Sequence, residues 1–228
     1  IMDGVLSQEE INALLNNDSA SGSGDELLTD AEKDAIGEIA NISMGTAATT
    51  LFSLVNRRVE ISTPVVSFSN WDDIVNDYER PCVFIKIGYT QGLNGSNILV
   101  LKEKDVKVIT DLMMGGPGVA SDEPITELHL SAIGEAMNQM MGSASTSMSS
   151  MLNKKIDISP PIAEVIDLNE SMNTRKLPDF LKSKFVKVSF KMLIGDLIDS
   201  EIMQLYPIDF ARELLNMFSL DPTMGGQT

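Results

Sequence analysis

Hydrophobic and polar positions follow a helical period in two long stretches of the chain, residues 27–56 and 126–153. The first stretch has an apolar side that consists of Ile36, Ala40, Ala47, Leu51 and Leu54. At about 100° per residue, the opposite side gathers four residues within roughly 60° of one another, namely Asp34, Glu38, Asn41 and Gly45. The pattern predicts an amphipathic helix with a buried face and an exposed polar face.

The second stretch repeats this arrangement 97 residues later. Its polar side carries Ser131, Glu135, Asn138 and Gly142, and its apolar side carries Ile133, Met137, Ala144, Met148 and Met151. A proline follows each helix at the same offset, Pro64 in the first copy and Pro161 in the second. Five aligned positions with the same internal spacing indicate a duplicated unit.

The segments after each long helix predict one order of elements in both halves. The first half reads as a strand at 59–68, a polar loop at 69–80, strands at 82–88 and 97–101 around a turn at 92–95, and a helix at 102–114. The second reads as strand segments at 155–159 and 162–168, a longer loop at 169–184, strands at 185–194 and 201–206, and a helix at 207–218. We expect an α+β fold in which two pseudo-twofold-related halves share one mixed sheet, with the long helices on one face.

Charge and composition exclude several function classes. The 228 residues carry a net charge of −16, which argues against binding nucleic acid or an anionic membrane surface. No apolar run approaches the ~18 residues of a membrane span, and no signal peptide is visible. Cys82 is the single cysteine, so no disulfide is expected and a cytoplasmic location is favoured. His129 is the single histidine and has no recognisable triad partner.

The paired Glu and Asn suggest a chemistry that needs neither a cysteine nor a metal ligand set. Residues three apart on a helix are neighbours, so both side chains can act on one object. An amide can hold a water molecule, and hydrolysis of an activated phosphoryl group needs mainly a positioned water and charge neutralisation. A glutamate can pair with a lysine of a partner, and the glycine one turn later lets a partner's backbone approach. The candidate catalytic residues are Glu38, Asn41, Glu135 and Asn138.

A simpler interpretation stays open, because Glu and Asn on a solvated helix face often have no function. The duplication with the same face geometry favours the functional interpretation. One of the two faces can still be inactive, since spacing alone does not distinguish them.

Residues 1–15 form a separate amphipathic element. Ser7 and Glu10 are placed for a capping box, and Leu6 and Ile11 for a hydrophobic staple. Ile11, Leu14 and Leu15 then form an apolar stripe. Because so short a helix is marginal alone, we expect it to fold on a partner, with packing on its own domain as the alternative.

Four segments follow from this organisation. Residues 1–15 are a binding peptide, 16–26 a flexible linker, 27–218 a domain with repeats at about 27–118 and 124–218, and 219–228 a polar tail. The linker tethers the peptide near the helix faces, which raises the local concentration of a captured ligand.

The repeated pattern, Asp/Ser-x3-Glu-x2-Asn-x22-Pro, resembles the signature of the CheC, CheX and FliY phosphatases of bacterial chemotaxis. Both copies match it in full, with Asp34, Glu38, Asn41 and Pro64 in one and Ser131, Glu135, Asn138 and Pro161 in the other. The resemblance implies a CheC-like fold and removal of phosphate from the response regulator CheY. It also implies that Asn orients the attacking water and that Glu contacts a lysine of the regulator. Mg²⁺ is then expected on CheY and not on this chain.

Residues 6–15 resemble the N-terminal peptide of the flagellar switch proteins, which implies binding to phosphorylated CheY. Asn12 departs from the aspartate that is more usual there. The resemblance further implies a place at the flagellar basal body, with FliM, FliN and FliG as partners if a C-terminal FliN-like domain, absent from this sequence, completes the protein. The alternative function is a non-catalytic switch scaffold that binds phosphorylated CheY.

Overall fold

Each of the two long polar and apolar stretches forms a helix of 26 residues, α2 at Asp30–Val55 and α5 at Glu127–Leu152. The computed structural model describes residues 28–78, 82–166 and 178–219. The expected peptide at 1–15, the whole linker at 16–26 and the tail after residue 219 lie outside the described residues. No helix within those ranges is long and apolar enough to cross a membrane.

Both long helices start and end in the same way. A capping box forms at the start of α2, where Thr29 Oγ1 accepts from the Glu32 backbone N–H at 3.2 Å. In α5, Thr126 and His129 make the equivalent box, with His129 Nδ1 accepting from the Thr126 N–H at 3.0 Å. The helices end at Asn56 and Asn153, which adopt left-handed backbone conformations with φ of 51° and 48°. These caps satisfy terminal backbone groups and fix where each helix stops.

Seven strands form one sheet in the order β1-β6-β7-β3-β2-β4, with β5 also paired to β2. The strands are β1 Val59–Ser69, β2 Cys82–Gln91, β3 Ser96–Lys102, β4 Asp157–Ile158, β5 Ile162–Ile166, β6 Phe185–Ile194 and β7 Ile198–Tyr206. The halves meet at the antiparallel pair β3 and β7. All pairings among the described strands are antiparallel, which corrects the expectation of a mixed sheet. The sequence neighbours β2 and β3, and likewise β6 and β7, pair as antiparallel hairpins. The remaining strands cross between the halves, because β1 pairs with β6 and both β4 and β5 pair with β2.

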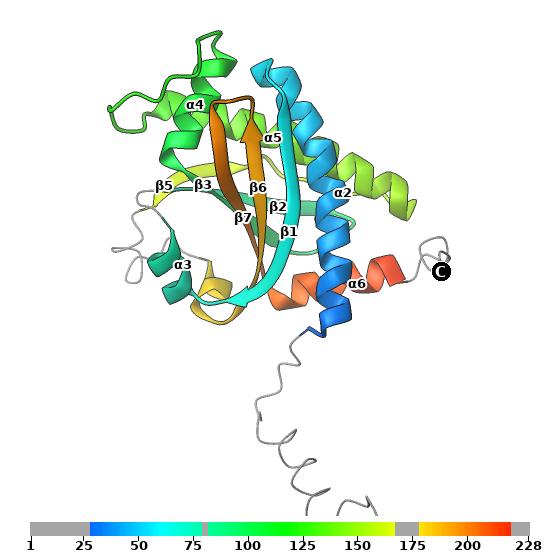
Figure 1. The fold of residues 1–228 in the computed structure, drawn as a ribbon. Helices are drawn as coiled ribbons and strands as arrows, with labels where there is room; N and C mark the ends of the chain where they lie inside the picture. Colours follow the sequence, from blue (N-terminus) through cyan, green and yellow to red (C-terminus); the bar gives the residue numbers. More distant parts are fainter. Residues whose placement is uncertain (1–27, 79–81, 167–177, 220–228) are drawn as a thin grey trace, which may run out of the picture.

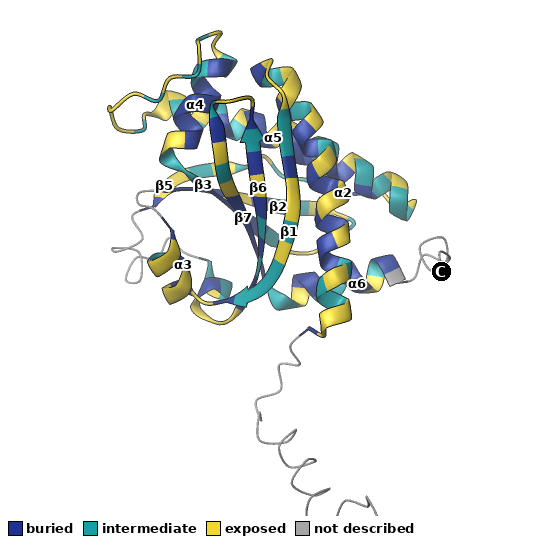
Figure 2. Cartoon of the chain, in the orientation of Figure 1, coloured by how far each residue is buried: buried dark blue, intermediate teal, exposed yellow. Residues whose placement is uncertain are grey.

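The helices α2, α4 (Glu103–Met113), α5 and α6 (Ile208–Ser219) pack on one face of the sheet, which was predicted for the two long helices α2 and α5. Figure 2 shows the buried side of α2 turned toward the sheet and its exposed side turned outward. The predicted apolar sides of both long helices enter this core, including Ile36, Met44, Leu51, Ile133 and Met148. The amphipathic pattern therefore sets which side of each helix meets water.

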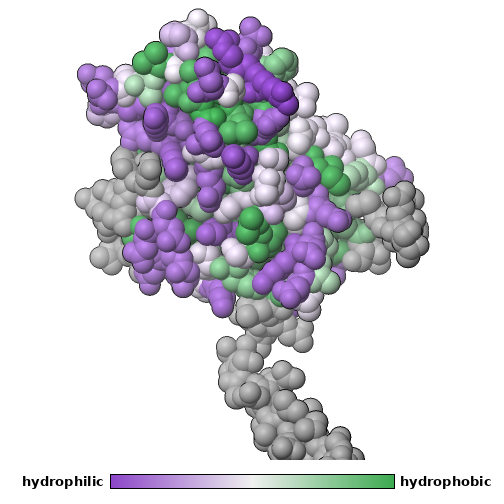
Figure 3. All heavy atoms as spheres, viewed as in Figure 1, coloured by the Kyte–Doolittle hydropathy of each residue, from purple (hydrophilic) through white to green (hydrophobic). Residues whose placement is uncertain are grey.

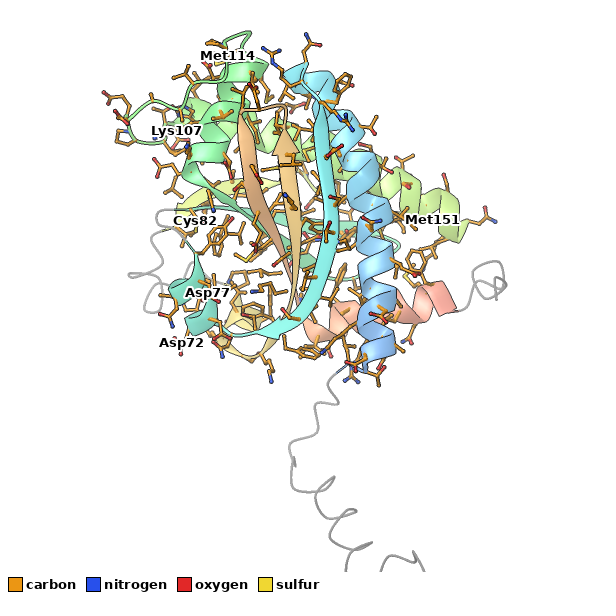
Figure 4. All side chains as sticks on the ribbon, in the orientation of Figure 1. Asp72, Asp77, Cys82, Lys107, Met114 and Met151 are labelled. Carbon is orange, nitrogen blue, oxygen red and sulfur yellow. The ribbon has the colours of Figure 1, made fainter. Side chains whose placement is uncertain are left out.

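A second hydrophobic cluster lies on the opposite face of the sheet. It is covered by α3 (Trp71–Asp77) and the short 3-10 helix η2 (Asp179–Lys182), with Trp71, Cys82 and Phe185 among its buried residues. Cys82 is fully buried, as expected, and Figure 4 shows Asp72 and Asp77 on α3.

The helix α3 corrects the predicted loop at 69–80. Asn70 Oδ1 accepts from the Asp73 N–H at 2.9 Å, and Trp71 and Ile74 are buried, so a cap and two apolar anchors hold a helix in a polar segment.

The predicted strand at 155–159 is also shorter than expected. Only Asp157–Ile158 pair as β4, and the strand resumes at Ile162 after Pro160 and Pro161. Proline cannot donate a ladder hydrogen bond, which explains the break.

Leu51 and Phe52 provide a matched test of the helix orientation. Leu51 is fully buried, whereas Phe52 is 48% exposed. Leu51→Ala should lower the free energy of unfolding by about 2–5 kcal/mol through lost apolar contacts and a cavity. Phe52→Ala should change it by no more than about 0.5 kcal/mol. Urea denaturation measures both, and equal losses would contradict the orientation of α2.

Two tyrosines under α6 predict a loss of stability at alkaline pH. Burial raises the pKa of Tyr89 to about 12, and Asn97, which donates to its hydroxyl, lowers the pKa only partly. The pKa of Tyr206 is also raised, by burial and then by the charge of Tyr89.

Because the unfolded chain ionises near pH 10 and the folded protein does not, the stabilisation is complete below pH 10 and is lost above it. For Tyr89 the loss is about 1.4 kcal/mol per pH unit up to about pH 12. Tyr89→Phe should flatten the decline in urea denaturation measured at several pH values, and an unchanged slope would contradict the assignment.

Candidate functional site

The predicted polar residues of α2 lie together on its exposed side. Asp34, Glu38, Asn41 and Gly45 are all exposed, while the residues opposite them enter the core. A groove of about 620 Å³ runs along this side of the helix. It is lined by Asp30, Lys33, Asp34, Gly37, Glu38, Asn41, Pro64 and Val66. The structure therefore brings four predicted motif residues, Asp34, Glu38, Asn41 and Pro64, to one site.

A β-bulge in β1 accompanies the position of Pro64. The pairing of β1 with β6 shifts between Ser62 and Val65, and Thr63 has a φ of 56°. A β-branched residue in the left-handed region is an unusual conformation, and it is adopted next to the groove. The bulge inserts Thr63 and Pro64 into the edge strand beside α2.

Lys33 adds a cation to the groove that the motif does not include. Its Nζ lies 4.0 Å from Asp30 Oδ1 and 5.1 Å from the centroid of the Phe68 ring. Lys184 approaches the same ring at 5.7 Å. A positive charge thus lies among the acidic residues of this groove.

The second face on α5 has the same exposed polar residues. Ser131, Glu135 and Asn138 are exposed and Gly142 is half-buried. Gln139 Nε2 donates to Glu135 Oε1 at 2.9 Å. At the first face the aligned residue is Ile42, and no described residue makes a hydrogen bond or ion pair with Glu38.

The segments around the two prolines differ. Pro160 stands where the first copy has Thr63, because the two residues are 97 positions apart. The proline ring fixes φ near −65°, so the left-handed conformation of Thr63 is closed to Pro160. The second copy has a break between β4 and β5 where the first has a bulge.

The motif glycines are not required by packing. A Cβ added at Gly45 or Gly142 would meet no atom within 4 Å. Gly92 differs, because its φ is 87° and an added Cβ would lie 2.4 Å from the Lys155 carbonyl oxygen. Gly45 and Gly142 therefore leave open surface that a partner can approach.

An exposed apolar residue follows each motif proline. Val65 is 59% exposed and Ile162 is 60% exposed, at aligned positions of the two copies. Figure 3 shows a small apolar area over β1 with hydrophilic residues around it. Each half thus has an exposed apolar side chain directly after its motif proline, on β1 in the first copy and at the start of β5 in the second.

The two long helices also contact each other directly. The Thr50 and Ser143 hydroxyls are within hydrogen-bond distance of each other, and Ala47 and Ala144 are buried. Small side chains let the helices approach closely, which fixes the two polar faces in one rigid unit.

Four groove residues were not predicted from the sequence, namely Asp30, Lys33, Gly37 and Val66. A signal for Gly37 was present, because the tetrapeptide Ala-Ile-Gly-Glu occurs at 35–38 and again at 132–135. Nothing in the repeat marked Lys33, whose aligned residue is Leu130. In the described part of the chain, no group of three or more His, Cys, Asp or Glu residues could hold a metal ion.

Comparisons with known proteins match both copies of the motif. A model of the CheC-like family matches residues 32–68 and 128–165. The flagellar motor switch phosphatase FliY of Bacillus subtilis (strain 168) is 49% identical over 216 residues, which cover 92% of this chain and 57% of the relative. The chain therefore spans a little over half the length of that protein.

Solved structures agree with the sequence matches. The crystal structure of Thermotoga maritima FliY is 42% identical, with a TM-score of 0.77 over 85% of this chain and 98% of that one. A chain in the FliG–FliM complex of H. pylori shares only 15% identity and a TM-score of 0.66 over 83% of this chain and all of that one, which indicates a common fold. The agreement of sequence, motif and fold shows that the chain belongs to the FliY/CheC family.

Proposed function

We propose that this protein is a phosphatase that hydrolyses the aspartyl phosphate of the response regulator CheY at the flagellar motor switch. The observation that carries the proposal is the exposed Glu and Asn pair on each long helix, Glu38 with Asn41 and Glu135 with Asn138. Family membership and the FliY relative, which is named a flagellar motor switch phosphatase, support it.

In the proposed mechanism the asparagine amide holds the attacking water. Asn41 and Asn138 are exposed, and no hydrogen bond to a described residue occupies either amide. An amide offers both a donor and an acceptor, so it can orient water toward phosphorus without acting as a base. Positioning of this kind is the main requirement for phosphoryl hydrolysis.

The glutamate fixes the docking geometry in this mechanism. Its carboxylate pairs with the lysine beside the phosphorylated aspartate of the regulator through a charge-assisted hydrogen bond. In this proposal Mg²⁺ is bound by CheY, where it neutralises negative charge on the phosphoryl group. Gly45 and Gly142, with open space around them, let the regulator's backbone approach one turn further along each helix.

The proposed setting is the flagellar motor switch, which the name of the relative mentions, and the proposal places the protein on its cytoplasmic side. The peptide at 1–15 captures phosphorylated CheY and presents it to the helix faces. The further partners FliM, FliN and FliG belong to the same proposal, because this chain spans only part of its relative.

A double asparagine variant tests catalysis. Asn41→Ala combined with Asn138→Ala should reduce phosphate release from phosphorylated CheY, measured with Mg²⁺, to the intrinsic rate of the regulator. Both side chains are exposed, so the thermal unfolding midpoint should be unchanged. Wild-type turnover by the double variant would contradict the role of Asn in positioning water.

Removing residues 1–24 tests the scaffold alternative. If the helix faces are catalytic, stimulated hydrolysis survives with a higher apparent KM and an unchanged kcat, because only the local concentration of the regulator falls. Loss of all binding on truncation, with no stimulated hydrolysis by either protein, would favour the non-catalytic scaffold.

A further inference from the structure

The two helix faces differ at the residue that follows each motif asparagine. Ile42 occupies this position on α2, and Gln139 occupies it on α5. Each of them lies four positions after the motif glutamate, so the two side chains are neighbours on the helix surface. The difference therefore lies directly beside the proposed catalytic pairs.

On the first face, Glu38 makes no hydrogen bond or ion pair with a described residue. Ile42 cannot hydrogen-bond to a carboxylate, and no described residue holds Glu38. Both Glu38 oxygens are available to a cation of a partner. Ile42 is 40% exposed and offers an apolar contact to whatever covers this face.

On the second face the glutamate is already held. The Gln139 amide donates to Glu135 Oε1 at 2.9 Å, and both residues are exposed. A lysine of a partner must displace this donor or share the carboxylate with it. A partner that covers Gln139 must also remove water from its amide, which costs free energy. The isoleucine at the same position of the first face carries no such cost.

We propose that the residue at positions 42 and 139 makes the two faces unequal, so that the face on α2 binds the phosphorylated regulator more tightly. This inference rests on the proposed function. Gln139 is a positioning residue that acts through Glu135, and Ile42 is a docking residue. The water-holding asparagines are the same on both faces, so the difference concerns binding and not the chemical step.

The expected difference is modest. Exposed pairs four residues apart on a helix are weak, and burial of one isoleucine adds an ordinary apolar contact. Together they correspond to a roughly three- to tenfold lower apparent KM for the first face, with similar kcat.

Single-face proteins separate the two contributions. Asn138→Ala leaves only the first face active, and Asn41→Ala leaves only the second. Phosphate release from phosphorylated CheY with Mg²⁺, measured over a range of regulator concentrations, gives kcat and KM for each. The first-face protein should show the lower KM.

Exchanging the residues supplies the matched control. Ile42→Gln in the first-face protein should raise KM severalfold, and Gln139→Ile in the second-face protein should lower it, with kcat unchanged in both. Gln139→Ala frees Glu135 without adding an apolar contact and should give an intermediate KM. Both substituted positions, 42 and 139, are exposed, so circular dichroism should show unchanged helix content in all three variants.

The outcomes are distinguishable. Equal KM values for the two faces, a lower KM for the second face, or exchanges that leave KM unchanged would overturn the inequality while leaving the proposed function intact. If the protein with both asparagines replaced still hydrolyses at the wild-type rate, the proposed catalytic faces are wrong and the inference fails with them. If the wild-type protein does not accelerate phosphate release, the proposed function itself fails.

Discussion

The joint burial of α2 and α5 against one face of the sheet is the constraint on which the rest of the structure depends. Each helix has one apolar side, and both sides must leave water together. Ala47 and Ala144 keep the helices close, and Met44 and Leu51 fill the space beneath them. Once these residues are buried, the rotation of each helix is set. Glu38 and Glu135 then have to face solvent, because a carboxylate buried without partners would be costly.

This constraint explains how two distant segments of sequence become one working unit. The sheet joins the halves through the antiparallel pair β3 and β7, and the helices meet at Thr50 and Ser143. The two polar faces therefore keep a fixed relation to each other. A partner that binds one face would meet a rigid helix side and not a loop, which suits the proposed reaction, because that reaction depends on the position of one water molecule.

The periodicity of apolar residues predicted the features that follow from burial. It did not predict features that depend on a local cap or on an unusual backbone conformation. The helix faces, the hairpin around Gly92 and the helix-covered side of the sheet follow from apolar spacing and turn residues. The helix α3 was missed because only Trp71 and Ile74 anchor it, and the cap at Asn70 resembles ordinary loop composition. The bulge at Thr63 was invisible, since a β-branched residue gives no sign of a left-handed backbone. Lys33 was missed because the groove that it lines is formed by tertiary packing, and because the second copy has no lysine at the aligned position.

On the exposed sides of α2 and α5, some residues are the same in both copies and one differs. The comparison is informative because the stability of the fold depends little on any of these exposed side chains. Exposed helix positions away from caps tolerate most substitutions within about 0.5 kcal/mol. Glu, Asn and Gly are nevertheless the same in both copies, although packing requires none of them and Gly45 even lowers helix propensity. The neighbouring position has changed from isoleucine to glutamine under the same weak structural demand. The fold explains neither the identity of the first three residues nor the difference at the fourth, whereas the proposed docking of a regulator on both faces accounts for both.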